Sequence, residues 1–105
     1  DDNLVSVDEV NVSLPTEFKL YQNYPNPFNP STTIQYAISN RQFVSLKVFD
    51  VLGNEVVTLV DEFRNAGRYE VEFKSSVSRQ LASGIYFYKL QAGSFVETKK
   101  MILIK

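Results

Sequence analysis

The feature that most limits the fold of this chain is the recurrence of apolar residues at every second position. The pattern is clearest at Tyr69, Val71 and Phe73, which alternate with charged residues. Successive side chains of a strand point to opposite faces of a sheet, so this alternation indicates strands with one buried and one solvated face. The same pattern predicts core faces on two earlier strands, at Ile34, Tyr36 and Ile38 and at Val44, Leu46 and Val48.

Further strands are expected over residues 56–60, 85–90 and 95–104, separated by turn residues. The dipeptide Gly53-Asn54 is a two-residue hairpin signal. All four glycines fall between the expected strands, where positive φ would let the chain reverse: Gly53, Gly67, Gly84 and Gly93. About seven short strands joined by short turns, without a helical period, predict an all-β fold, an immunoglobulin-like antiparallel β-sandwich.

Two polar stretches and the beginning of the chain are less regular. Asp61-Glu62 is expected in a turn, and residues 75–83 in a loop. Residues 1–17 are acidic and carry alternating valines, which indicates a linker or an edge strand, followed by one domain over residues 18–105. The chain begins with Asp1 rather than methionine, which suggests a piece of a longer protein.

Three of the four prolines lie in residues 24–32, which read YPNPFNPST and are called the proline segment below. Each proline fixes φ, lacks an N–H group and pushes the preceding residue toward extended geometry. We therefore expect a stiff corner, where the chain crosses between sheets and enters the strand near Thr33. Phe28 is expected to plug one end of the sandwich, while Asn26 and Asn29 form local turn hydrogen bonds.

Composition argues against several classes of function. Eleven basic and twelve acidic residues give no broadly basic surface for nucleic acid or an anionic membrane. No stretch approaches the roughly 20 apolar residues that span a bilayer. The chain has no histidine and no cysteine, so the usual bases, nucleophiles and zinc ligands are missing, and we expect no catalytic, cofactor or metal site. Calcium held by Asn26, Asn29, backbone carbonyls and an acidic residue is a weaker alternative, because the oxygen ligands are few and no Asp/Asn loop has the spacing of a calcium site.

A series of motifs, the first of which contains the proline segment, occurs in order along the chain. Residues 20–36 read LYQNYPNPFNPSTTIQY, and Val48-Phe49-Asp50 with Gly53, then Ala66-Gly67, come later. Residues 81–86 read LASGIY, and the chain closes on KKMILIK at residues 99–105. Over residues 18–105 this order resembles the C-terminal sorting domain of the type IX (Por) secretion system, found in cargo proteins of Bacteroidetes-like bacteria. The immunoglobulin-like domain of flagellar hook-capping proteins resembles the same core, but the lysine-ended tail favours the sorting family.

The resemblance implies a non-catalytic, removable address. Such a domain would follow an upstream cargo domain, be recognised in the periplasm by an outer-membrane translocon and be cut off by a sortase-like peptidase, leaving the cargo secreted or at the cell surface. Cleavage would then fall in the acidic lead-in before Phe18. The family's signal motifs match eight positions of this sequence: Pro25, Asn26, Pro27, Gly84, Tyr86, Lys99, Lys100 and Lys105.

The residues themselves also allow simpler interpretations. Gly84 and Tyr86 suit a turn and a core aromatic, and terminal lysines can discourage unwanted strand pairing at an edge. If Tyr86 points inward, Ile85 and Phe87 point outward, where they could contact sugar rings or a partner protein. An accessory module of a secreted enzyme, either carbohydrate-binding or a structural or adhesive spacer, therefore remains the alternative function.

Overall fold

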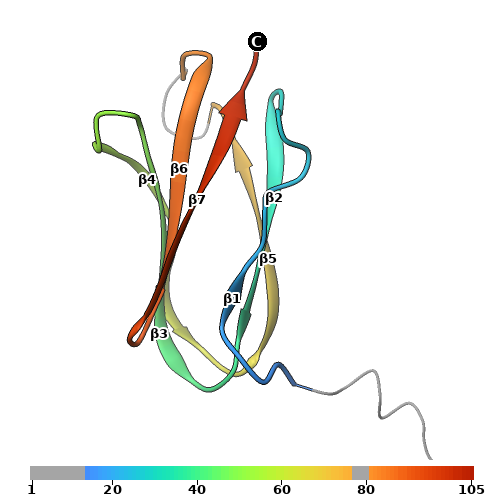
Figure 1. The fold of residues 1–105 in the computed structure, drawn as a ribbon, viewed down its shortest axis with the longest axis vertical. Coiled ribbons are helices and arrows are strands. Elements are labelled where there is room, and N and C mark those ends of the chain that lie inside the picture. Colours follow the sequence, from blue (N-terminus) through green and yellow to red (C-terminus); the bar gives the residue numbers. More distant parts are fainter. Residues whose placement is uncertain (1–13, 77–80) are drawn as a thin grey trace, which may run out of the picture.

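The chain folds into two antiparallel sheets that face each other (Figure 1). The computed structural model describes residues 14–76 and 81–105. One sheet has the order β1-β2-β5 and the other β4-β3-β6-β7. Within the described residues the strands are β1 (Lys19–Leu20), β2 (Ser31–Ile38), β3 (Gln42–Phe49), β4 (Glu55–Arg64), β5 (Gly67–Lys74), β6 (Gly84–Ala92) and β7 (Phe95–Leu103). The all-β, immunoglobulin-like sandwich expected from the alternation is thus confirmed.

The core lies between the sheets, where the alternation predicted it. The inward residues of β2 and β3 are at most 2% exposed, and Phe73 of β5 is fully buried. Tyr69 and Val71 of β5 are only half-buried, because β5 is an edge strand of its sheet. Burying each large apolar side chain contributes about 1.5–3 kcal/mol, so these inward rows favour one strand register over a slip by one residue.

β3 and β4 form the hairpin that Gly53-Asn54 predicted, but residues 50–54 connect them instead of two residues. Gly53 has a φ of 87°, a conformation that glycine adopts without the steric cost of a Cβ atom. The Asp50 carboxylate accepts hydrogen bonds from the N–H groups of Leu52 and Asn54 at 3.0 and 2.9 Å. Gly84 and Gly93 also have positive φ, as expected, but Gly67 does not. Gly67 starts β5 opposite Ile38, so its prediction as a positive-φ turn residue was wrong.

The turn predicted at Asp61-Glu62 was also wrong, because both residues lie within β4. Irregular register sets the ten residues of β4 against the eight of β3. Val60 lies opposite Leu46, whereas the next pairs are Thr58 with Lys47 and Val57 with Val48. Asp61 and Glu62 themselves keep regular register with Ser45 and Val44. Both are exposed on this edge strand, so two successive acidic residues resemble a turn.

Two predicted segments lie outside the described residues. They are residues 1–13, which carry most of the acidic lead-in, and residues 77–80 of the expected loop. After that loop the chain rejoins the core at Leu81, which is buried and donates its N–H to the Ser75 carbonyl at 3.3 Å. None of the described residues forms a helix long and apolar enough to cross a membrane.

Candidate functional site

The proline segment lies along the end of β7. The N–H of Phe28 donates to the Ile102 carbonyl at 2.9 Å, and the N–H of Ile104 donates to the Phe28 carbonyl at 3.0 Å. Phe28 is thereby paired with Leu103 in a parallel bridge. The segment therefore covers part of an edge of the four-stranded sheet while it leads the chain into β2 of the other sheet.

The side chains of the proline segment divide into inward and outward groups. Phe28 is 1% exposed and packs edge-to-face on Phe73 at a centroid distance of 5.9 Å, so the expected plug is confirmed. Pro25, Asn26 and Pro27 are exposed. The Asn26 carboxamide oxygen accepts a hydrogen bond from the N–H of Ile102 at 3.0 Å, across 76 positions. This long-range bond replaces the local turn bond that was expected for Asn26.

A buried polar network, which the sequence analysis missed, holds the start of the proline segment. The Asn23 amide donates to Thr32 Oγ1 at 3.0 Å and to the Pro25 carbonyl at 3.1 Å, and the Thr32 hydroxyl donates to the same carbonyl at 2.8 Å. Asn23 and Thr32 are each 2% exposed. Thr32 occupies an inward position of β2, so a polar residue in a row of core residues was the signal that could have revealed this network.

Tyr88 links the network to the four-stranded sheet. Its hydroxyl accepts from the N–H of Asn23 at 2.8 Å and donates to the Tyr21 carbonyl at 2.7 Å. Burial raises the pKa of Tyr88 to about 12, although the bond from Asn23 opposes this shift. The hydroxyl consequently stays protonated at neutral pH and keeps both bonds.

The second predicted motif lies next to the end of β7. Gly84 pairs with Leu103, and Tyr86 pairs with Met101. Tyr86 is 7% exposed and donates its hydroxyl to the Ala82 carbonyl at 2.7 Å, so it is the core aromatic that the residue pattern allowed. The start of β6, the tip of β7 and the connection into β2 all lie at one end of the sandwich (Figure 1).

The three predicted lysines do not share one surface. Successive residues of β7 face opposite sides, so Lys100 projects from the outer face of its sheet whereas Lys99 does not. Lys99 Nζ lies 3.3 Å from the Glu97 carboxylate, and the Lys99 side chain is 28% exposed. Lys105 is exposed, and its N–H donates to Ser83 Oγ at 3.1 Å. The structure thus brings Lys100 and Lys105 to the end that carries the other motifs and turns Lys99 away.

Apolar side chains surround Lys100 on this outer face. Ile85 lies opposite Ile102 in the register, and Phe87 lies opposite both Lys100 on one side and Phe49 on the other. Ile85 is 40% exposed, which confirms its expected outward direction. We call residues 25–28, 83–87 and 100–105 the signal end. Its chemistry, apolar side chains beside exposed ammonium groups, suits contact with a protein rather than catalysis.

The described part of the chain has no grouping of three or more acidic side chains that could hold a metal ion. Asp50, Glu97 and Glu55 each have partners that account for them locally, in a turn or in an ion pair. The Glu55 pKa is lowered mainly by the hydrogen bond from Thr58, an exposed surface contact. These acidic residues therefore give no support for a metal-dependent or acid-base site.

Comparison with known proteins shows similarity to a protein family and to a solved structure. The family model described as the secretion system C-terminal sorting domain matches residues 22–105. A solved chain of PorZ, a bacterial surface component of the type IX secretion system of Porphyromonas gingivalis, is similar in fold with a TM-score of 0.58 and 19% sequence identity. The alignment covers 82% of this chain and 11% of the PorZ chain. No match was found among curated proteins.

Proposed function

The chain belongs to the C-terminal sorting domains of the type IX secretion system, and on that premise we propose that the signal end is the surface by which the system recognises it. A domain of this family is a sorting signal that interacts with the secretion system and directs export to the cell surface or the medium. The family is in general non-catalytic.

The observation that carries the proposal is the pairing of Phe28 with the end of β7. Phe28 exchanges backbone hydrogen bonds with Ile102 and Ile104, more than 70 positions away in the chain. Gly84 lies beside Leu103 on the other side of the same strand. Three motifs that are far apart in sequence are therefore neighbours only when the domain is folded, which favours recognition of a folded surface over recognition of an extended tail.

The predicted signal residues divide into two roles in this proposal. Pro25, Pro27, Lys100 and Lys105 are exposed and would contact the secretion system directly. The other residues are positioning residues: Asn26 holds the segment on β7, Gly84 and Tyr86 set the start of β6, and the Lys99 ammonium is paired with Glu97.

Membership of the family also suggests which proteins of the secretion system contact the domain. We propose that the contacting protein is the outer-membrane translocon, and that a sortase-like peptidase cuts the chain before Phe18, releasing an upstream cargo domain. Phe18 packs on Phe95 at a centroid distance of 5.7 Å, and β1 begins at the next residue. A cut before Phe18 would therefore remove no residue of the described sandwich core. The domain itself would be non-catalytic.

The experiment fuses residues 1–105 behind a reporter that is exported to the periplasm, in a host with the type IX system and in the same host without its translocon. We expect the reporter at the surface or in the medium only in the first host. Equal surface delivery in both hosts would contradict the proposal.

Point variants then test the signal end itself. Removal of residues 99–105 is unsuitable, because it deletes Met101 and Leu103, which are fully buried. The Lys100→Glu/Lys105→Glu variant changes only exposed side chains, and we expect it to leave the folded reporter in the periplasm. Lys74→Glu is the matched control, since Lys74 is an exposed lysine on the other sheet. Export of both variants at the wild-type level would show that the secretion system does not recognise the signal end.

A further inference from the structure

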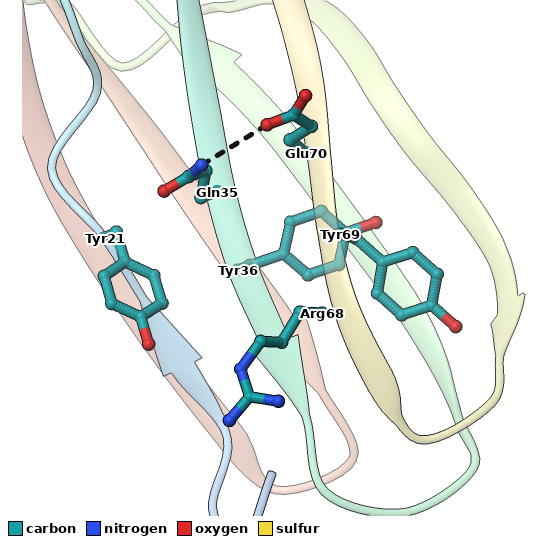
Figure 2. A pocket seen from close by; sticks show the side chains of 6 residues that line it. All are labelled: Tyr21, Gln35, Tyr36, Arg68, Tyr69 and Glu70. Carbon is teal, nitrogen blue, oxygen red and sulfur yellow. Dashed lines mark hydrogen bonds between the residues drawn. The ribbon is translucent and has the colours of Figure 1, made fainter. Parts of the chain in front are cut away.

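A shallow groove runs along the outer face of the three-stranded sheet and ends at Tyr24, next to the signal end. Its central hollow has a volume of about 350 Å³ and is lined by six residues, shown in Figure 2. A second hollow continues it past Tyr21 and Arg68, and a third of about 390 Å³ continues it past Gln35 and Glu70 to Tyr24. Neighbouring hollows share lining residues, so they form one surface. We call it the tyrosine groove and define it by six residues: Tyr21, Tyr24, Thr33, Gln35, Arg68 and Glu70.

The two tyrosines are exposed aromatic rings held on a rigid backbone. Tyr24 is 80% exposed and Tyr21 is 37% exposed. The backbone of Tyr24 exchanges two hydrogen bonds with Thr33, at 3.0 and 2.9 Å, and the N–H of Tyr21 donates to the Gln35 carbonyl at 3.0 Å. The backbone at both tyrosines is thus held against β2, and neither exposed ring is part of the core. The Lys19 ammonium lies 5.2 Å from the centroid of the Tyr21 ring.

Polar groups line the groove beside the rings. The Gln35 amide donates to the Glu70 carboxylate at 3.3 Å, and Figure 2 shows Arg68 further along the same face. An amide and a carboxylate on one surface offer both donors and acceptors to a ligand. The charges have both signs, which disfavours a polyanion such as nucleic acid, and the polar lining disfavours an apolar peptide.

We propose that the tyrosine groove binds a short stretch of a neutral polysaccharide. A sugar ring has an apolar face of C–H groups and a rim of hydroxyl groups. Tyrosine rings can lie against the first, and the amide and carboxylate can pair with the second. Strand addition does not compete for this surface, because the groove lies on a face of the sheet where β2 is paired with β5. The groove meets the signal end at Tyr24, which precedes Pro25, but binding of a polysaccharide goes beyond the proposed sorting function.

The test is electrophoresis of residues 1–105 through native gels that contain mannan, dextran or galactan. We expect retardation in at least one of them. Tyr24→Ala and Tyr21→Ala should each weaken the apparent affinity about fivefold or more, the loss expected for one aromatic contact. Phe63→Ala is the matched control, because Phe63 is a 58% exposed aromatic on the other sheet, and this variant should migrate like the wild type.

A second measurement locates the contact. An oligosaccharide of the retarding polysaccharide is titrated into the isotope-labelled chain, and we expect NMR shift changes at the amides of Tyr21, Tyr24, Gln35 and Glu70. Absence of retardation in all three gels, or equal retardation of the Tyr21→Ala/Tyr24→Ala variant and the wild type, would overturn the proposal. Either result leaves the export assay of the sorting function unaffected.

Discussion

The N–H of Asn23 donates to the hydroxyl of Tyr88 at 2.8 Å, across 65 positions of the chain. Asn23 lies immediately before the proline segment, and Tyr88 lies in the centre of β6, so the bond ties the connection into β2 to the opposite sheet. The same hydroxyl donates to the Tyr21 carbonyl at 2.7 Å. One side chain of the core therefore fixes both the tyrosine groove and the approach to the signal end.

Replacement of Tyr88 by phenylalanine should destabilise the domain by about 1–3 kcal/mol, because the N–H of Asn23 is left buried without its acceptor. The free energy of unfolding in urea measures this loss. Tyr24→Phe removes a hydroxyl from an exposed ring and should change stability by less than about 0.5 kcal/mol. A Tyr88→Phe variant as stable as Tyr24→Phe would show that the two bonds do not contribute.

The raised pKa of Tyr88 predicts a loss of stability at high pH. Burial raises this pKa from 10.0 to about 12, so between these values the unfolded chain loses the proton and the folded chain keeps it. Stability from this group is complete below pH 10 and falls as pH rises through 12, by on the order of 2 kcal/mol. Burial also raises the pKa of Tyr36, which acts in the same direction.

Unfolding free energies at intervals from pH 8 to pH 12 test this expectation. Lysine and arginine side chains also lose protons in this range, so the useful quantity is the difference between the wild type and Tyr88→Phe. That difference should shrink as pH rises above 10, since the variant lacks the titrating group. A difference that stays constant to pH 12 would contradict the raised pKa.

Much of the sandwich could be predicted because most inner strands are regular. Ile34, Tyr36 and Ile38 alternate with residues that face outward, and burial of such a row fixes both face and register. The predictions were wrong at Asp61-Glu62, where two successive exposed acidic residues of an edge strand resemble a turn, and at Gly67, where a glycine at a strand start resembles a turn residue. The alternation of apolar residues describes one strand at a time and does not show how that strand pairs with its neighbours.

The candidate site was predictable in its members but not in its arrangement. The motifs containing Asn26, Gly84 and Lys100 were found in the sequence, but nothing in local periodicity pairs Phe28 with Leu103. That bridge depends on how two distant segments pack, and so does the direction of the Asn26 side chain toward Ile102. The opposite directions of Lys99 and Lys100, in contrast, follow directly from their adjacent positions in a strand.

Truncation of Phe28 should be among the most damaging single changes. The ring is 1% exposed and contacts Phe73 edge-to-face, so Phe28→Ala leaves a cavity and should cost about 3–5 kcal/mol. Phe43→Ala removes a 45% exposed ring and should cost much less. Urea unfolding of the two variants compares these costs, and equal losses would show that Phe28 does not plug the sandwich.

Asn26 should act on β7 through its side-chain oxygen. Asn26→Ala removes the acceptor of the Ile102 N–H and should cost about 0.5–1.5 kcal/mol, with faster hydrogen exchange at the Ile102 amide. Asn26→Asp keeps an oxygen at the same place, and a carboxylate accepts at least as strongly as an amide, so this variant should retain the protection. Exchange at the Tyr36 amide, in the opposite sheet, serves as the internal control and should be unchanged. If Asn26→Ala leaves exchange at Ile102 as slow as in the wild type, the backbone bonds of Phe28 alone hold the proline segment on β7.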